Sequence, residues 1–215
     1  MDHKLTGTKT VITRTITLLM LIFSVNFSVA YAEISGSAHD FSRESWAEGQ
    51  ICLPCHTPHF ATGDDDAPLW NHETTTATYT LYNRGSLDAT TGQPRGVSKL
   101  CLSCHDGTVA IDSFGGRSGS IFIDSDFHLG SDLSDDHPIS FIFDDALATE
   151  DGELFPPSST PSGIPGSNGT IQTDMLVNDS LECSSCHDVH NANDFDELLV
   201  KSNDGSALCL TCHNK

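Results

Sequence analysis

Eight cysteines occur in this chain of 215 residues, and all eight fall into four copies of one pattern, Cys-x-x-Cys-His. We number these copies as motifs 1 to 4: Cys52–His56, Cys101–His105, Cys183–His187 and Cys209–His213. No cysteine is left over for a disulfide bond or for a thiol nucleophile. Any fold of this chain must therefore accommodate four equal groups, each with two thiols and an adjacent imidazole.

The spacing within the motifs has a chemical meaning. Residues at i, i+3 and i+4 share one face of a helical turn. Two thiols three residues apart can reach the two vinyl groups on one edge of a porphyrin, and the next histidine then lies under the iron. Cys-x-x-Cys pairs also build zinc ribbons, but those do not require a histidine after every second cysteine. The motifs predict four covalently attached haem c groups. The predicted attachment residues are Cys52, Cys55, Cys101, Cys104, Cys183, Cys186, Cys209 and Cys212, and the predicted proximal iron ligands are His56, His105, His187 and His213.

The motifs form a twofold repeat. Motifs 1 and 3 both read CxxCHxxH, ending at His59 and His190, and motifs 2 and 4 both read LCLxCH. A further histidine stands upstream in each half, His39 in the first and His137 in the second. This self-similarity predicts two dihaem units, at about residues 37–119 and 133–215.

The repeat also predicts the second axial ligands. Met175 is the one methionine after residue 32, so at least three irons cannot have a His/Met pair. We expect the distal ligands to be His39, His59, His137 and His190, with His72 as the reserve candidate. His59 and His190 follow a proximal histidine by three residues and cannot reach the far face of the same haem. Each is therefore expected to bind a neighbouring haem, whereas His128 is interpreted as a surface residue.

The first 32 residues have the pattern of a secretory signal peptide. Lys4, Lys9 and Arg14 precede a mostly apolar run over 15–29, and Ala30-Tyr31-Ala32 fits the cleavage pattern. The apolar run is short and contains Asn26, which suits a membrane span poorly. We expect cleavage after Ala32, no membrane insertion afterwards, and a single tetrahaem domain over 33–215.

The charge balance excludes some partners. Ten Lys and Arg oppose thirty Asp and Glu, giving a formal net charge of −20. Such a surface repels nucleic acid and anionic membranes and suits cationic partners and metal ions. A solvated acidic face without a partner role explains the same composition, so both interpretations stay open.

Four haems in so short a chain predict a mostly irregular, coil-rich multihaem cytochrome c. The porphyrins must supply much of the buried apolar surface, because aromatic residues are scarce. Short helices are expected at the haem motifs, and a few short strands elsewhere. The strand candidates are 74–82, 121–123 and 139–143, a helix is predicted over 194–201, and 152–170 reads as a loop.

Several phrases, CLPCHTPH, APLWNH, LCLSCHDGTVA and DDHPISF, resemble the doubled-CxxCH multihaem cytochromes of metal-respiring bacteria. The resemblance runs from His39 to His213 and is weak over 120–133 and 147–179. It is strongest to the secreted tetrahaem cytochromes that polymerise into extracellular filaments. The resemblance implies a continuous chain of haems and a homopolymer. It also implies other cytochromes and extracellular acceptors such as metal oxides as partners. The location would be extracellular or at the outer cell surface, with the periplasm as the alternative.

The expected function is outer-sphere electron transfer through four bis-histidine haems, and we expect no enzyme activity. A soluble monomeric periplasmic carrier is one alternative. A multihaem reductase is another, but it would need an iron with an open position. A structural polymer with haems as folding cores is the third. Because His39 lies near the start of the mature chain, it is expected to ligate a haem of the next subunit. The alternative is that the lead-in of a monomer folds back onto its own first haem.

Overall fold

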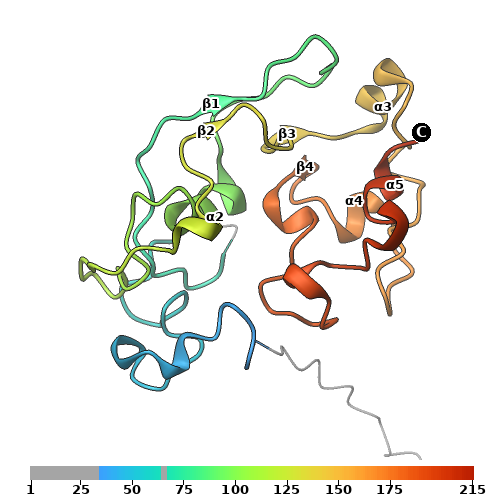
Figure 1. Ribbon diagram of the computed structural model, residues 1–215. Coiled ribbons are helices and arrows are strands. Elements are labelled where there is room, and N and C mark those ends of the chain that lie inside the picture. The colour runs from blue at the N-terminus through green and yellow to red at the C-terminus, as the bar shows by residue number, and fades with distance from the viewer. Residues whose placement is uncertain (1–33, 64–66) are drawn as a thin grey trace, which may run out of the picture. The chain divides into compact units, whose positions relative to one another are not determined.

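Turns and irregular segments make up most of the computed structural model, which describes residues 34–63 and 67–215 (Figure 1). The predicted signal peptide lies outside the described residues. The elements are short: η1 (Phe41–Arg43), η2 (Ser45–Ala47), β1 (Thr80–Leu81), α2 (Gly96–His105), η3 (Ser125–Phe127), β2 (Asp132–Leu133), β3 (Phe141–Ile142), α3 (Asp145–Asp151), α4 (Ile171–Asp174), β4 (Ser180–Leu181), η4 (Cys183–Ser185), η5 (Asp196–Leu198), η6 (Asp204–Ser206) and α5 (Cys209–Cys212). This confirms the predicted coil-rich fold class.

Two small sheets connect distant parts of the chain. β1 pairs in parallel with β2, placing Thr80 opposite Asp132, and β3 pairs antiparallel with β4, placing Phe141 opposite Leu181. The predicted strands 74–82 and 139–143 each contain one of these strands, although only two residues long. The predicted strand 121–123 is wrong. The backbone N–H of Ile121 bonds to the Asp112 carboxylate instead of to a neighbouring strand.

The predicted helix over 194–201 is also wrong. Only the short turn η5 forms there, with Glu197 in the left-handed region at φ 57°. The chain instead forms an isolated β-bridge between Leu199 and His187, and the Val200 N–H bonds to the Cys186 carbonyl. These tertiary contacts with motif 3 override the local helix propensity of the segment.

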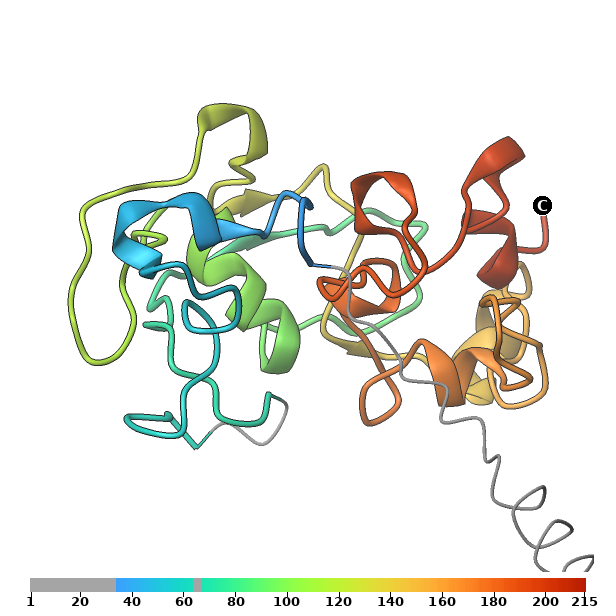
Figure 2. The same ribbon diagram turned by 90° about the horizontal axis from the view of Figure 1, so that it is seen from below.

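The motifs lie on one helical turn each, in different settings. Motif 2 occupies the second half of α2, whose residues Leu100 and Leu102 are buried. Motif 3 begins on η4 and motif 4 on α5. Motif 1 forms a single turn in which the His56 N–H bonds to the Cys52 carbonyl. Figure 2 shows motifs 1 and 2 (cyan and green) on one side of the described unit and motifs 3 and 4 (orange to red) on the other.

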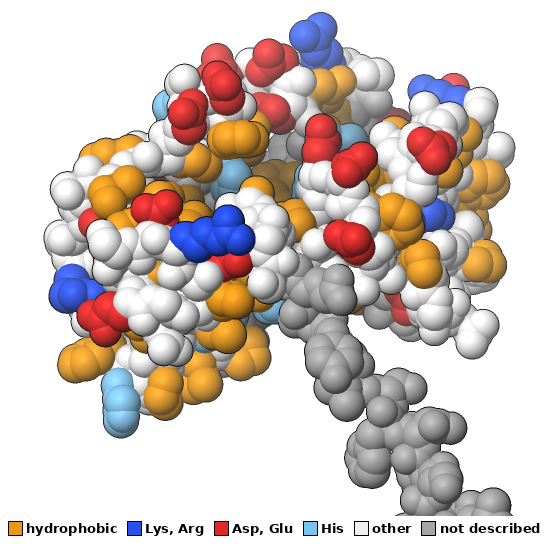
Figure 3. Space-filling view, turned by 60° about the horizontal axis from the view of Figure 1, so that its bottom comes forward, with side chains coloured by type: hydrophobic (Ala, Val, Ile, Leu, Met, Phe, Trp, Pro, Cys, Tyr) orange, Lys and Arg blue, Asp and Glu red, His pale blue; other side chains and the backbone are white. Residues whose placement is uncertain are grey.

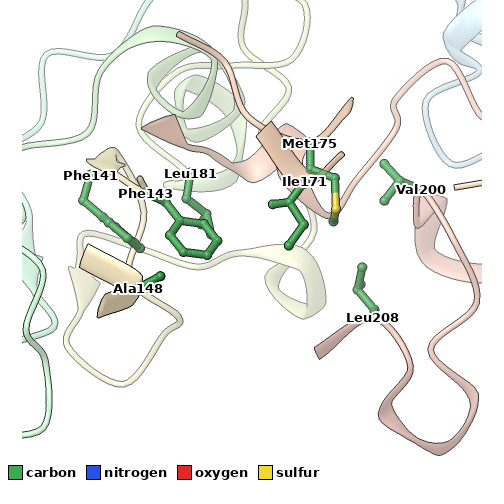
Figure 4. Close-up of a cluster of buried hydrophobic side chains, with 8 residues drawn as sticks. All are labelled: Phe141, Phe143, Ala148, Ile171, Met175, Leu181, Val200 and Leu208. Atoms are coloured by element: carbon green, nitrogen blue, oxygen red, sulfur yellow. The ribbon is translucent and has the colours of Figure 1, made fainter. Parts of the chain in front are cut away.

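The hydrophobic core is small and lies against motifs 3 and 4 (Figure 4). Its buried members are Phe141, Phe143, Ala148, Ile171, Met175, Leu181, Val200 and Leu208. The half-buried Cys186 and Cys212 pack against this cluster, so the two thiols lie at the border of the core. A second cluster of Tyr79, Leu102 and Leu133 lies under motif 2.

A buried polar network joins α2 to η4. Glu182 is 3% exposed, and its carboxyl oxygen accepts hydrogen bonds from the hydroxyls of Ser98 and Ser140. The Ser98 hydroxyl oxygen also accepts from the Cys183 N–H at 3.0 Å. Motif 2 and motif 3 are therefore held together by fixed side chains. No helix of the described residues has the length and apolarity to cross a membrane.

Candidate functional site

The cysteines of successive motifs lie close to one another. Cys101 and Cys183 share a hydrogen bond, which raises the pKa of the Cys101 thiol and lowers that of Cys183. Burial, with a smaller contribution from nearby Cys55, raises the pKa of Cys104 to about 12. Burial also raises the pKa of Cys186, with Cys183 and Cys209 adding to it. Motif 1 therefore neighbours motif 2, motif 2 neighbours motif 3, and motif 3 neighbours motif 4.

Backbone pairings fix each proximal histidine just after its cysteines. Isolated β-bridges join His56 to Trp70, His187 to Leu199, and His213 to Leu154. His105 is held differently, because its carbonyl accepts the Leu129 N–H at 2.7 Å. Each imidazole is thus placed by a contact with a second segment, so the motif turn alone does not determine its position.

Three histidine pairs face each other across a gap. The ring centres are 6.1 Å apart for His39 and His105, 6.4 Å for His56 and His190, and 6.4 Å for His137 and His213. Each pair joins one predicted proximal ligand to one predicted distal ligand. The pair of His190 and His56 also connects motif 3 to motif 1, as expected for a histidine that binds a neighbouring haem.

The gap suits an iron atom. Metal–nitrogen bonds of about 2 Å on each side, plus roughly 1 Å from each nitrogen to its ring centre, give about 6 Å between ring centres. Free thiols and imidazoles are also the donor set of a covalently attached haem. The residues therefore fit this cofactor at three of the four motifs.

Hydrogen bonds orient the proximal rings. The Nδ1 atoms of His56, His105 and His187 lie 2.7 Å, 3.1 Å and 3.0 Å from the carbonyls of Pro68, Phe127 and Glu197. A carbonyl only accepts, so each Nδ1 carries the proton and donates. Nε2 is then the nitrogen left with a lone pair for a metal, which is the usual outer-shell arrangement of ligating histidines.

The reserve candidate His72 does not have this arrangement. It is 2% exposed, its Nδ1 lies 2.9 Å from the Glu73 carbonyl, and its Nε2 lies 3.1 Å from the Ala110 carbonyl. His128 likewise directs Nε2 to the Asp106 carbonyl at 2.6 Å, while its ring is exposed. These contacts favour structural roles for both residues.

His59 and His187 are left without a facing ring. His59 is exposed, and among the described residues no ring contact places a second histidine opposite His187. Three of the four predicted distal ligands, His39, His137 and His190, thus lie beside a predicted proximal histidine in the described chain.

The lead-in that carries His39 is folded onto its own chain. Asp40 accepts hydrogen bonds from the N–H groups of Gly36 and Ser42, and residues 35–38 line one pocket together with 191–198. Burial, and then the nearby His105 and His187, lower the pKa of His39 to about 4. His39 therefore lies beside His105 of its own chain, and its expected contact with a haem of the next subunit stays a prediction.

Sequence reasoning missed a carboxylate that supports motif 2. Asp106 is 3% exposed and accepts hydrogen bonds from the hydroxyls of Tyr79 at 2.5 Å, Thr75 at 2.7 Å and Thr108 at 2.7 Å. The next residue, Gly107, has φ +74°, and a Cβ there would lie 2.1 Å from His128 Nε2. The Asp-Gly-Thr sequence after His105 was the available signal.

Comparison with known proteins gives one result that bears on this site. Residues 175–215, which contain motifs 3 and 4, match the family model described as the doubled CXXCH motif. Comparison with curated proteins gives no match. The family match supports a multihaem c-type cytochrome, and the CxxCH motifs indicate covalently bound haem c. Such cytochromes are associated with electron transfer rather than catalysis.

Proposed function

We propose that this protein is a tetrahaem c-type cytochrome that carries electrons by outer-sphere transfer. The observation that carries the proposal is the set of three facing imidazole pairs, each 6.1–6.4 Å apart and each opposite a CxxCH motif. An iron held between two imidazoles has no coordination position for a substrate. Electrons therefore enter and leave through the porphyrin edges.

The order of the motifs supports a conducting path. Motif 1 neighbours motif 2 through Cys55 and Cys104, and motif 2 neighbours motif 3 through Cys101 and Cys183. Haems attached at these cysteines would lie close to one another in sequence order. Bis-histidine ligation lacks the His/Met pair that raises the potential of other c-type cytochromes, so low potentials are expected.

The location and partners follow from the predicted signal peptide and the family resemblance. We propose a secreted protein at the outer cell surface or outside the cell. Its partners would be other cytochromes and extracellular acceptors such as metal oxides. Figure 3 shows many acidic and few basic side chains on the visible face, which suits mineral cations better than polyanions.

Assembly into a homopolymer is part of this proposal. His59 is exposed beside Phe60, which is 77% exposed and has a left-handed backbone at φ 63°. Other large apolar side chains are also exposed in this half of the unit: Leu69, Ile121, Phe122, Phe127 and Leu129. Exposed apolar surface of this kind marks interaction sites. We assign His59 to the iron above His187 of an adjacent subunit, and the monomeric carrier is the alternative.

A second function has one observation in its favour. Because no described ring faces His187, that iron would be open in a monomer and could bind a small oxyanion, as a reductase requires.

Electron paramagnetic resonance separates the two functions. Electron transfer predicts low-spin signals from every haem of the secreted protein and one new high-spin signal in His190→Ala. A persistent high-spin haem in the assembled wild-type protein, changed by added oxyanion, would support the reductase.

A further inference from the structure

The Lys201 ammonium is attached to the haem-attachment loop of motif 4. Its Nζ donates hydrogen bonds to the Ser162 carbonyl at 2.8 Å and to the Thr211 hydroxyl oxygen at 2.9 Å. Thr211 lies between the two cysteines of motif 4, is 7% exposed, and donates its own proton to the Ala207 carbonyl. The half-buried lysine is therefore fixed against the turn that would carry the C-terminal haem.

Among the residues that the structure describes, no carboxylate lies within ion-pair distance of the Lys201 ammonium. The ion pairs found in the described part of the chain join His190 to Asp188 and Lys215 to Glu153, and neither involves Lys201. Both hydrogen-bond acceptors of the ammonium are neutral. In a chain with thirty acidic residues and ten basic ones, a half-buried lysine without an acidic partner is unusual.

The backbone leaves space for this ammonium. Gly163 has φ +66°, and a Cβ at that position would lie 2.7 Å from the Lys201 Nζ. A side chain at position 163 would displace the ammonium from its present place and would be strained at this φ, so glycine suits the turn that supplies the Ser162 carbonyl. Two segments, the 162–163 turn and motif 4, thus form one cradle for one cation.

We propose that Lys201 is a positioning residue that holds a positive charge against the haem of motif 4 and raises its reduction potential. The proposal rests on the tetrahaem electron-transfer function. When a ferrous neighbour passes one electron to this ferric haem, the haem gains one negative charge and the neighbour loses one. A fixed cation stabilises the reduced form, more strongly in a half-buried site than in water. Electrons would then collect at the C-terminal end of the haem chain.

Motif 3 has an acidic side chain beside it, in contrast to the lysine beside motif 4. The residue before its first cysteine is the buried acid Glu182, whereas motif 4 has a lysine bonded inside it. Among the described side chains, Lys201 is the one lysine or arginine that donates a hydrogen bond to a residue inside a CxxCH motif. The two neighbouring haems therefore have unlike electrostatic environments.

The test is a spectroelectrochemical titration of the haem-loaded protein, resolved into four one-electron steps. Lys201→Gln keeps amide donors but removes the charge, and it should shift one of the four midpoint potentials to a more negative value. Lys201→Arg keeps the charge and should shift none. The matched control is Arg84→Gln, which removes an exposed positive charge outside the haem motifs and should leave all four midpoint potentials unchanged.

The proposal is overturned if Lys201→Gln shifts no potential, or shifts all four equally as a distant surface charge would. If that variant fails to load haem, Thr211→Val decides, because it removes the acceptor that holds the ammonium and should cause a smaller negative shift of one step. Mass spectrometry of the wild-type protein is independent of these variants. Fewer than four haems there would refute the tetrahaem function, whereas four haems with unchanged potentials would refute only the role of Lys201.

Discussion

At the scale of single residues, Asp106 shows how a side chain next to an iron ligand can serve packing. It follows His105 directly, yet its carboxylate oxygens face Tyr79, Thr75 and Thr108. These hydrogen bonds outweigh the opposing effect of burial and lower the pKa of Asp106 below its ordinary value of 3.8. The carboxylate therefore ties the segments before and after motif 2 to the end of α2.

Asp106→Ala should destabilise the haem-loaded protein. A buried hydroxyl left without a partner costs about 1–3 kcal/mol, and the Tyr79 hydroxyl loses its acceptor, whereas Thr75 keeps its hydrogen bond to Thr108. In a chain of this size each kcal/mol corresponds to about 2–4 °C of melting temperature. Thermal melting by far-UV circular dichroism measures the effect, and the exposed Asp126→Ala is the control. An unchanged melting temperature in Asp106→Ala would contradict the structural role.

The same carboxylate predicts a pH dependence. Because its folded-state pKa is lowered, its contribution is fully present above pH 3.8 and is lost as the pH falls through the folded-state pKa. The difference in stability between the wild type and Asp106→Asn should therefore shrink below pH 3.8. A difference that stays constant down to pH 2 would show that the charge is not involved.

Residue types and motif spacing named the candidate ligands, and their binding to iron stays a prediction. Pairing partners did not follow from the sequence, because they depend on loops that fold back. The position of His39 within its own chain depends on such a contact, because Asp40 caps its turn beside His105. The sequence also did not show whether a nitrogen of His72 is available to bind iron. In the structure its Nδ1 faces the Glu73 carbonyl and its Nε2 faces the carbonyl of Ala110, a residue distant in the sequence.

At the scale of elements, the structure depends on contacts between short pieces. α2 was predictable at motif 2, because the CxxCH spacing of Cys101, Cys104 and His105 places these three residues on one helical turn. The absence of a helix at 194–201 was not predictable, because the competing conformation is stabilised by a backbone pairing of Leu199 with His187. Neither sheet has strands longer than two residues, so periodicity could not set their bounds.

Glu182→Ala should loosen the contact between α2 and η4. The Ser98 and Ser140 hydroxyls lose a buried acceptor, which costs about 1–3 kcal/mol for each group left unsatisfied. We expect faster amide hydrogen exchange in α2 and a lower melting temperature. The control, Glu150→Ala on the exposed side of α3, should change stability by less than about 0.5 kcal/mol. Equal effects of the two substitutions would refute the clamp.

At the scale of the whole molecule, the proposed polymer predicts a specific dependence on His59. His59→Ala should abolish filaments and leave one high-spin haem per chain, because the iron above His187 loses its second imidazole. Asn83→Ala, which removes an exposed polar side chain outside the haem motifs, should leave filaments and low-spin haems intact. Electron microscopy detects the filaments, and electron paramagnetic resonance detects the high-spin haem. Filaments of His59→Ala with all haems low-spin would show that a different residue forms the joint.

We expect the haems to supply much of the apolar surface that this chain buries. One cluster of eight buried hydrophobic residues and a second of three form the core of the described residues, and cysteines of motifs 3 and 4 lie at its border. The folded state and the proposed electron path therefore depend on how many motifs carry haem. Intact mass spectrometry of the mature protein measures this most directly. We predict the mass of residues 33–215 plus four haems, with no thiol left to alkylate. A mass with fewer haems, or with zinc in place of haem, would contradict the account.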